Sequence, residues 1–87
     1  MSYILAVFSV RTETMSFYNM LKRARINAMI VETPKIIQAS CGISVKFIQA
    51  DFLKVKNLMA LNYLKNSVRY YVLNGTFGRT NITPLNY

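Results

Sequence analysis

The sequence contains no histidine and no tryptophan, and its 87 residues include only one cysteine and three carboxylates. Without histidine, imidazole catalysis, a His-ligated metal and a Ser-His-Asp triad are excluded. A single cysteine excludes an internal disulfide framework and a Cys-rich zinc site. Three carboxylates (Glu13, Glu32 and Asp51) offer little to a paired-carboxylate hydrolase. We therefore expect a binding module, a carrier or a structural subunit, and not an enzyme.

Glycine and proline are also scarce, with three and two residues, which excludes collagen-like and low-complexity sequence. Hydrophobic residues make up 53% of the chain and charged residues 16%, the reverse of a disordered composition. No apolar run approaches the ~20 residues that span a bilayer, and no signal peptide pattern is present. The length suits one domain, which we assign to residues 1–74, followed by a polar, irregular C-terminal tail at residues 75–87. A lone thiol and no membrane segment predict a cytoplasmic protein.

Positive charge dominates, because eleven Lys and Arg residues face three acids and give a net charge of +8. Such a field attracts nucleic acid, anionic membranes or acidic proteins. The same charge also keeps so apolar a chain in solution. The cations are spread out, with one cluster at residues 22–25. Charge alone therefore leaves both interpretations open.

Hydrophobic periodicity predicts six elements in the order β-α-β-β-α-β. Continuous apolar runs or alternation indicate strands, and apolar residues at helical spacing indicate helices. The predicted strands are residues 3–8, 28–31, 43–47 and 68–73, with Asn74-Gly75 ending the last, and the predicted helices are residues 15–25 and 52–65. A short helical turn is expected at residues 33–38. This order predicts an α+β, ferredoxin-like fold, with a four-stranded antiparallel sheet and two helices on one face.

Two helices cover only one face of such a sheet, yet three of the four strands are apolar on both faces. The other face is therefore expected to expose side chains such as Tyr3, Leu5 or Tyr70. Soluble monomers rarely leave such a patch open. A second copy, a partner protein, RNA bases or the tail could cover it, and we favour a homodimer.

Cys41 is the one plausible nucleophile, and its small neighbours would let a second sulfur approach closely. Its reactive form is the thiolate, which nearby positive charge favours. Lys35 and Lys46 are the nearest cations in the sequence. A helical turn ending at Cys41 would disfavour the thiolate, because the C-terminal end of a helix is negative. A buried, inert thiol is the competing interpretation, since free cysteine is often a small core residue.

Residues 34–42, Pro-Lys-Ile-Ile-Gln-Ala-Ser-Cys-Gly, resemble the signature of the small selenium/sulfur carrier protein-like family. That signature has a proline, a basic residue, an aliphatic residue two positions on and a Cys-Gly pair, and the resemblance extends over residues 3–73. It implies that Cys41 carries sulfur or selenium as a persulfide or selenosulfide, received from one protein and passed to an acceptor enzyme. Gly42 would let the acceptor approach, and Lys35 stands where the family usually has arginine.

Two other functions stay open on the sequence alone. A four-stranded split-βαβ sheet with a basic charge is the architecture of RNA-recognition modules, and Arg69 and Tyr71 would then be the contacts on the open face. The last strand lacks the aromatic spacing of the RNA-binding signature, however. The third function is a dimeric regulatory or structural protein in which Cys41 is inert.

Overall fold

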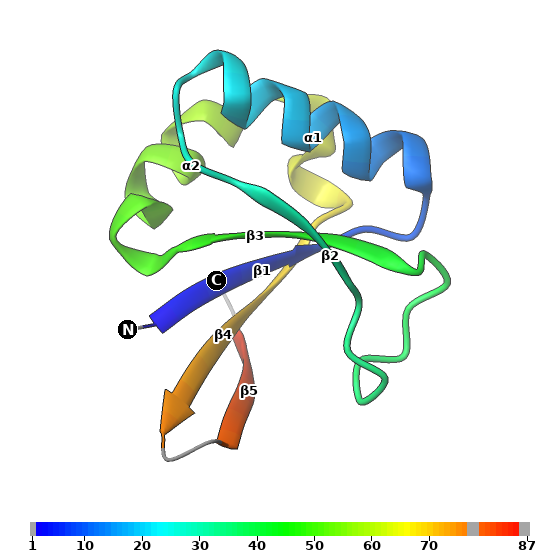
Figure 1. Ribbon diagram of the computed structural model, residues 1–87. Coiled ribbons are helices and arrows are strands. Elements are labelled where there is room, and N and C mark those ends of the chain that lie inside the picture. The colour runs from blue at the N-terminus through cyan, green and yellow to red at the C-terminus, as the bar shows by residue number, and fades with distance from the viewer. Residues whose placement is uncertain (1, 77–78, 86–87) are drawn as a thin grey trace.

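The computed structural model describes residues 2–76 and 79–85 as one five-stranded antiparallel sheet with two α-helices. The strand order is β2-β3-β1-β4-β5, and both helices lie on the same side of the sheet (Figure 1). The predicted α+β class is confirmed, but the sheet has one strand more than predicted. The elements in chain order are β1 (Ser2–Val7), α1 (Arg11–Arg23), β2 (Met29–Glu32), β3 (Ile43–Ile48), η1 (Gln49–Asp51), α2 (Phe52–Met59), η2 (Tyr63–Asn66), β4 (Arg69–Thr76) and β5 (Arg79–Leu85), where η marks a 3-10 helix.

The fifth strand comes from the segment predicted to be an irregular tail. β4 continues through Asn74 and Gly75, which were expected to end it, and these residues pair with Asn81 and Thr80 of β5. The prediction was wrong because β5 is polar and has little alternation of its own. Its strand conformation depends on the backbone groups that the edge of β4 offers. Residues 77, 78, 86 and 87 of the predicted tail lie outside the described residues.

One hydrophobic core lies between the sheet and the helices. Alternate side chains of β1, such as Ile4 and Ala6, point to this side and are fully buried. A row of aromatic rings crosses the core, with centroid separations of 5.2, 6.4, 6.4 and 5.1 Å along the series Phe8, Phe17, Phe47, Phe52 and Tyr70. Tyr70 is thus a core residue, 7% exposed, and the expectation that it lies on an open face is wrong.

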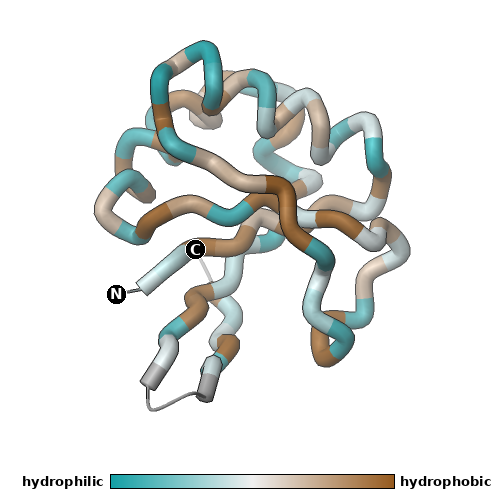
Figure 2. Tube along the Cα trace, in the orientation of Figure 1, coloured by the Kyte–Doolittle hydropathy of each residue, from teal (hydrophilic) through white to brown (hydrophobic). Residues whose placement is uncertain are grey.

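The opposite face of the sheet is covered by the segment that connects β2 to β3. Leu5 and Val7 are fully buried there, in a cluster with Ile37 and Leu73. This segment, residues 33–42, folds beneath the sheet, and Figure 2 shows hydrophobic residues at its lower end (Figures 1 and 2). The expected exposure of Leu5 is therefore wrong. A loop covers this face of the sheet, whereas the sequence periodicity predicts only helices as covering elements.

The helix α1 ends in a Schellman motif. The N–H of Arg25 donates to the carbonyl of Lys22 at 3.0 Å, and the N–H of Ile26 donates to the carbonyl of Leu21 at 2.9 Å. Arg25 adopts a φ of 61°, a left-handed conformation that glycine adopts more easily. Leu21 and Ile26 are both buried, so the motif directs the chain from α1 back into the core.

The helix α2 is shorter than predicted and ends at Met59. Beyond it Asn62 adopts an extended conformation, and its side chain accepts a hydrogen bond from the N–H of Leu64 at 2.8 Å. The same side chain donates to the sulfur of Met20 in α1 at 3.5 Å. Asn62 therefore begins η2 and attaches it to α1, which a continuous helix would not allow. Neither helix within the described residues is long and apolar enough to cross a bilayer.

Candidate functional site

Cys41 lies at the end of segment 33–42, and its side chain is 6% exposed. Its sulfur is 3.5 Å from Oγ1 of Thr14, a fully buried residue in the first turn of α1. The Thr14 hydroxyl also donates to the carbonyl of Val10 at 3.2 Å. The thiol therefore contacts the first turn of α1 through the side chain of Thr14.

Residues 33–38, before Cys41, do not form the predicted helical turn. These residues show one helix-like feature, a hydrogen bond from the N–H of Ile37 to the carbonyl of Pro34 at 2.9 Å. The expected negative helix end at Cys41 is therefore a wrong prediction. The helix that contacts the sulfur is α1, through the side chain of Thr14, which lies 27 positions away in the sequence.

Hydrogen bonds from Thr33 close the base of the segment. Its N–H donates to the carbonyl of Gly42 at 2.9 Å, and its hydroxyl donates to the carbonyl of Cys41 at 3.1 Å. The Thr33 hydroxyl is also 2.6 Å from the hydroxyl of Ser44, which is fully buried. Since the one hydroxyl hydrogen of Thr33 is directed to Cys41, Ser44 is the donor in this pair. The backbone on both sides of the thiol is thereby held in place.

The surface beside Cys41 is open even though its sulfur is covered. The two neighbours, Ser40 and Gly42, are exposed. A Cβ atom placed on Gly42 would meet no heavy atom within 4 Å. Ser40 makes one contact that holds the segment down, because its hydroxyl donates to the carbonyl of Ser9 at 3.0 Å. A partner that approaches Gly42 therefore meets free space, while hydrogen bonds from Thr33 and Ser40 restrain the backbone.

Lys35 and Lys46 are the lysines nearest Cys41 in the sequence. Lys46 lies beside the first residues of β1, and Lys35 lies early in segment 33–42. The Lys46 amine lies 4.3 Å from the ring centre of Tyr3, at the beginning of β1, whereas Cys41 lies near the residues that follow the end of β1. Lys35 is exposed, early in segment 33–42. The hydroxyl of Thr14 is what contacts the sulfur.

Sequence reasoning did not assign Thr14 to the site, although a signal for it exists. Thr14, Phe17 and Leu21 follow helical spacing and share the buried face of α1. A hydroxyl on a buried face needs a partner, so a polar residue at such a position indicates a contact with another polar or thiol group. What the pattern cannot supply is the identity of that partner.

Arg69 and Tyr71 lie at the start of β4, where the former is exposed and the latter half-buried. They line a hollow of about 370 Å³ together with Ile36, Ile37 and Gln38 of segment 33–42. The proposed nucleic-acid contacts and the Cys41-bearing segment are therefore neighbours in space, although a nucleic-acid role for them stays a prediction.

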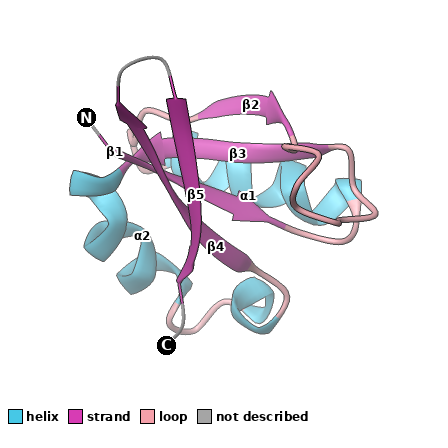
Figure 3. Cartoon of the chain, turned by 90° about the horizontal axis from the view of Figure 1, so that it is seen from below, coloured by secondary structure: helices cyan, strands magenta, loops and turns pink. Residues whose placement is uncertain are grey.

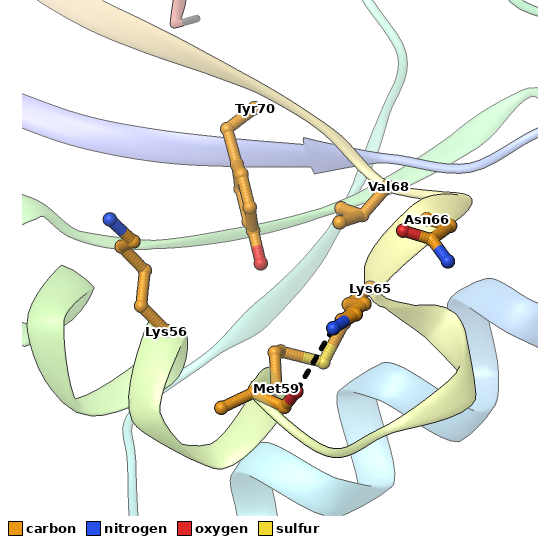
Figure 4. A pocket seen from close by; sticks show the side chains of 7 residues that line it. Lys56, Met59, Lys65, Asn66, Val68 and Tyr70 are labelled. Atoms are coloured by element: carbon orange, nitrogen blue, oxygen red, sulfur yellow. Dashed lines mark hydrogen bonds between the residues drawn. The ribbon is translucent and has the colours of Figure 1, made fainter. Parts of the chain in front are cut away.

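A second hollow, of about 400 Å³, lies between α2, η2 and β4 (Figure 4). Figure 4 shows Tyr70 reaching from β4 toward it, while Lys56 and Lys65 stand at its sides. The Lys65 amine donates to the carbonyl of Ala60 at 3.3 Å. Within residues 2–76 and 79–85, no three side chains that commonly ligate metals cluster together.

Comparison with known protein families gives a match over most of the chain. The model of the family described as "Putative Se/S carrier protein-like" matches residues 3–70. The chain belongs to this family. The match with the Se/S carrier-like family runs from β1 to the start of β4, so it includes Thr14, segment 33–42 and Cys41, and it ends before β5. Its description names a carrier and no catalytic activity. Comparisons with curated proteins and with solved structures gave no match.

Proposed function

We propose that this protein carries sulfur or selenium on Cys41, as a persulfide or a selenosulfide, and passes the atom to an acceptor enzyme. The observation that carries the proposal is the position of its one thiol. Within the part of the chain that matches the Se/S carrier-like family, Cys41 lies against the first turn of α1 and beside open surface at Gly42. A carrier needs one thiol and no further catalytic group.

The transfer is a pair of displacements at sulfur that need no outside oxidant. In loading, the Cys41 thiolate attacks the outer sulfur of a donor persulfide. A new S–S bond forms at Cys41, the S–S bond of the donor breaks, and the donor cysteine leaves as a thiolate. In unloading, the nucleophile of the acceptor attacks the outer sulfur, and Cys41 leaves as the thiolate. A terminal selenium atom moves by the same exchange.

Thr14 and the N-terminal turn of α1 support both steps in this mechanism. When Cys41 becomes a thiolate, the Thr14 hydroxyl can turn from the carbonyl of Val10 and donate to the sulfur, 3.5 Å away. A hydrogen bond to a charged acceptor is stronger than one to a neutral acceptor. The charged form is therefore stabilised both before loading and when Cys41 is the leaving group.

The partner must reach a sulfur that is nearly covered. Gly42 presents no side chain and lies beside free space, so we assign it to the surface that the acceptor contacts. Lys35 is an exposed cation on the same segment, and we assign it to the electrostatic attraction of an acidic partner. Replacing Gly42 with leucine should slow transfer to a protein acceptor, while release of the cargo by a small thiol stays unchanged.

Intact-mass measurement tests the carrier function directly. The folded protein should gain about 32 mass units from a small-molecule persulfide donor, or about 79 from the selenium analogue, and should lose them on reduction. The Cys41→Ser variant should gain nothing. If the wild-type protein gains mass only in denaturant, Cys41 is an inert core residue and the proposal is wrong.

Two structural assignments accompany this function. We assign β1 to β4 with α1 and α2 to the ferredoxin-like arrangement, supported by the order β2-β3-β1-β4 and by both helices lying on one face. The expected homodimer stays a prediction, and a single 10.0 kDa species in sedimentation at high concentration would contradict it. The argument from an open sheet face no longer supports it, since the side chains of Ile37 and Ile82 pack with Leu5 and Val7 on that side.

A further inference from the structure

Three adjoining hollows form a trough around the beginning of β4. The 400 Å³ hollow beside α2 shares Lys65, Val68 and Tyr70 with a third hollow, of about 310 Å³. This third hollow shares Arg69, Tyr71 and Pro84 with the 370 Å³ hollow beside segment 33–42. We call the three together the basic trough. Its lining residues belong to α2, η2, the start of β4, the end of β5 and segment 33–42. Figure 3 shows how these strands and helices are arranged.

The trough has charge of one sign. Its charged lining residues are Lys56, Lys65 and Arg69, and none of the three carboxylates of the chain lines it. The sequence contains no acidic residue after Asp51, and both Lys65 and Arg69 follow it. An anionic group beside Lys65 and Arg69 would therefore meet positive charge.

The remaining walls of the trough are largely apolar. They include Val68, Ile82 and Leu85. At the end near segment 33–42 stands Ile36, a large hydrophobic side chain that is 79% exposed. Since Ile36 lines the hollow, an apolar side chain of a bound molecule can pack against it. Ile36 belongs to the segment that carries Cys41, so the trough ends at segment 33–42, although Cys41 itself does not line it.

We propose that the basic trough binds an extended acidic segment, with interspersed apolar side chains, of the protein that exchanges sulfur or selenium with Cys41. The inference rests on the proposed function and adds the location and chemistry of the partner contact. Acidic side chains of the segment would pair with Lys65 and Arg69, and an apolar side chain would pack against Ile36. This contact holds the partner beside segment 33–42 while the exchange occurs.

Other occupants fit the trough less well. A second copy of the chain has only three carboxylates, Glu13 on α1, Glu32 on β2 and Asp51 in η1, so it offers no acidic run. A single-stranded nucleic acid needs a series of exposed aromatic rings for its bases. The trough contains Tyr71, which is half-buried, and Tyr70, which belongs to the core. Its apolar and cationic lining suits an acidic peptide better.

The test uses the full-length, isotope-labelled protein and a short probe peptide of mixed glutamate and leucine. We expect the amide resonances of Ile36, Lys65 and Arg69 to shift during a titration at low salt. Binding should weaken strongly at 1 M salt, where the screening length falls to about 3 Å. A peptide with lysine in place of glutamate should not bind.

Matched variants separate the trough from general charge attraction. Lys65→Glu should weaken probe binding about tenfold, whereas Lys54→Glu changes net charge equally, lies on α2 outside the trough and should change binding little. Ile36→Ser should also weaken binding, and Leu53→Ser, at a side chain 70% exposed elsewhere on the surface, should not.

Three results would overturn the trough proposal. These are no binding at low salt, equal weakening by the control variants, and an oligothymidylate that binds the trough as tightly as the acidic peptide. Loading of Cys41 by a small persulfide donor is measured on the same variants and should be normal in all of them. If the probe binds and Cys41 never loads, the carrier function is wrong while the docking site stands. If Cys41 loads normally and the probe does not bind, the docking site is wrong while the carrier function stands.

Discussion

The sulfur of Cys41 lies 3.5 Å from the hydroxyl oxygen of Thr14, although 27 positions separate the two residues. This contact joins the end of segment 33–42 to the first turn of α1. It gives the thiol a hydroxyl partner and a helix N-terminus in the same place. The chemistry proposed for Cys41 depends on this pairing more than on its neighbours in the sequence.

Removing the Thr14 hydroxyl should slow the reactions of Cys41. In Thr14→Val the shape is kept but the thiolate loses its donor, and hydrogen bonds to charged groups contribute about 1.5–3 kcal/mol. We expect modification by a mild thiol reagent at neutral pH to slow about tenfold or more, as followed by mass. Thr14→Ser keeps the hydroxyl and should react almost normally. Equal rates for the valine and serine variants would mean that Thr14 only fills space.

Breaking the hydrogen bond of Ser40 should have the opposite effect. Its hydroxyl donates to the carbonyl of Ser9 and restrains the segment beside the thiol. In Ser40→Ala the segment should open more often, and Cys41 should be labelled faster under native conditions. Ser16→Ala, at an exposed position on α1, serves as the control. A labelling rate unaffected by Ser40→Ala would show that other contacts limit access.

Loss of the Thr33 hydroxyl should lower the stability of the whole domain. Thr33→Val leaves the fully buried hydroxyl of Ser44 without its acceptor, which costs about 1–3 kcal/mol. The free energy of unfolding, measured in urea, should fall by this amount. Adding Ser44→Ala should restore part of the loss, because the buried polar group is then removed. A double variant less stable than the single one would contradict this account.

Arg25 offers a site for stabilisation. At a φ of 61° its side chain carries a steric penalty that glycine lacks, so Arg25→Gly should raise the free energy of unfolding by about 1 kcal/mol. Arg25→Ala removes the same charge but keeps a Cβ atom, and it should give little or none of this gain. Urea unfolding of both variants distinguishes conformational strain from charge.

Patterns within single elements predicted much of the fold. The continuous apolar run of β1 predicted a strand buried on both faces, and Ile4 and Leu5 are fully buried on opposite sides. The Cys-Gly pair and the preceding proline carried the family resemblance, which the match over residues 3–70 confirms. These signals are local, so a sequence without its structure retains them.

Features that depend on distant contacts were missed. The strand β5 exists because β4 has a free edge, and the cover over Leu5 exists because Ile37 folds under the sheet. Likewise, nothing near Cys41 in the sequence identifies Thr14 as its partner. Each depends on how separate segments meet, and hydrophobic periodicity does not report that.

Segment 33–42 has two roles, and exposing Cys41 to a partner conflicts with covering the sheet. It carries Cys41, and through Ile37 it shields Leu5 and Val7 from water. Moving the segment away from the sheet would expose these aliphatic side chains to water. The free-energy cost would be about 25 cal/mol for each Å² of apolar surface exposed. In the proposed carrier, the isolated molecule would therefore favour the state in which the sulfur or selenium atom is shielded from other oxidants and thiols. A partner whose apolar surface covers Leu5 and Val7 would remove this penalty, so transfer would take place only with the correct acceptor.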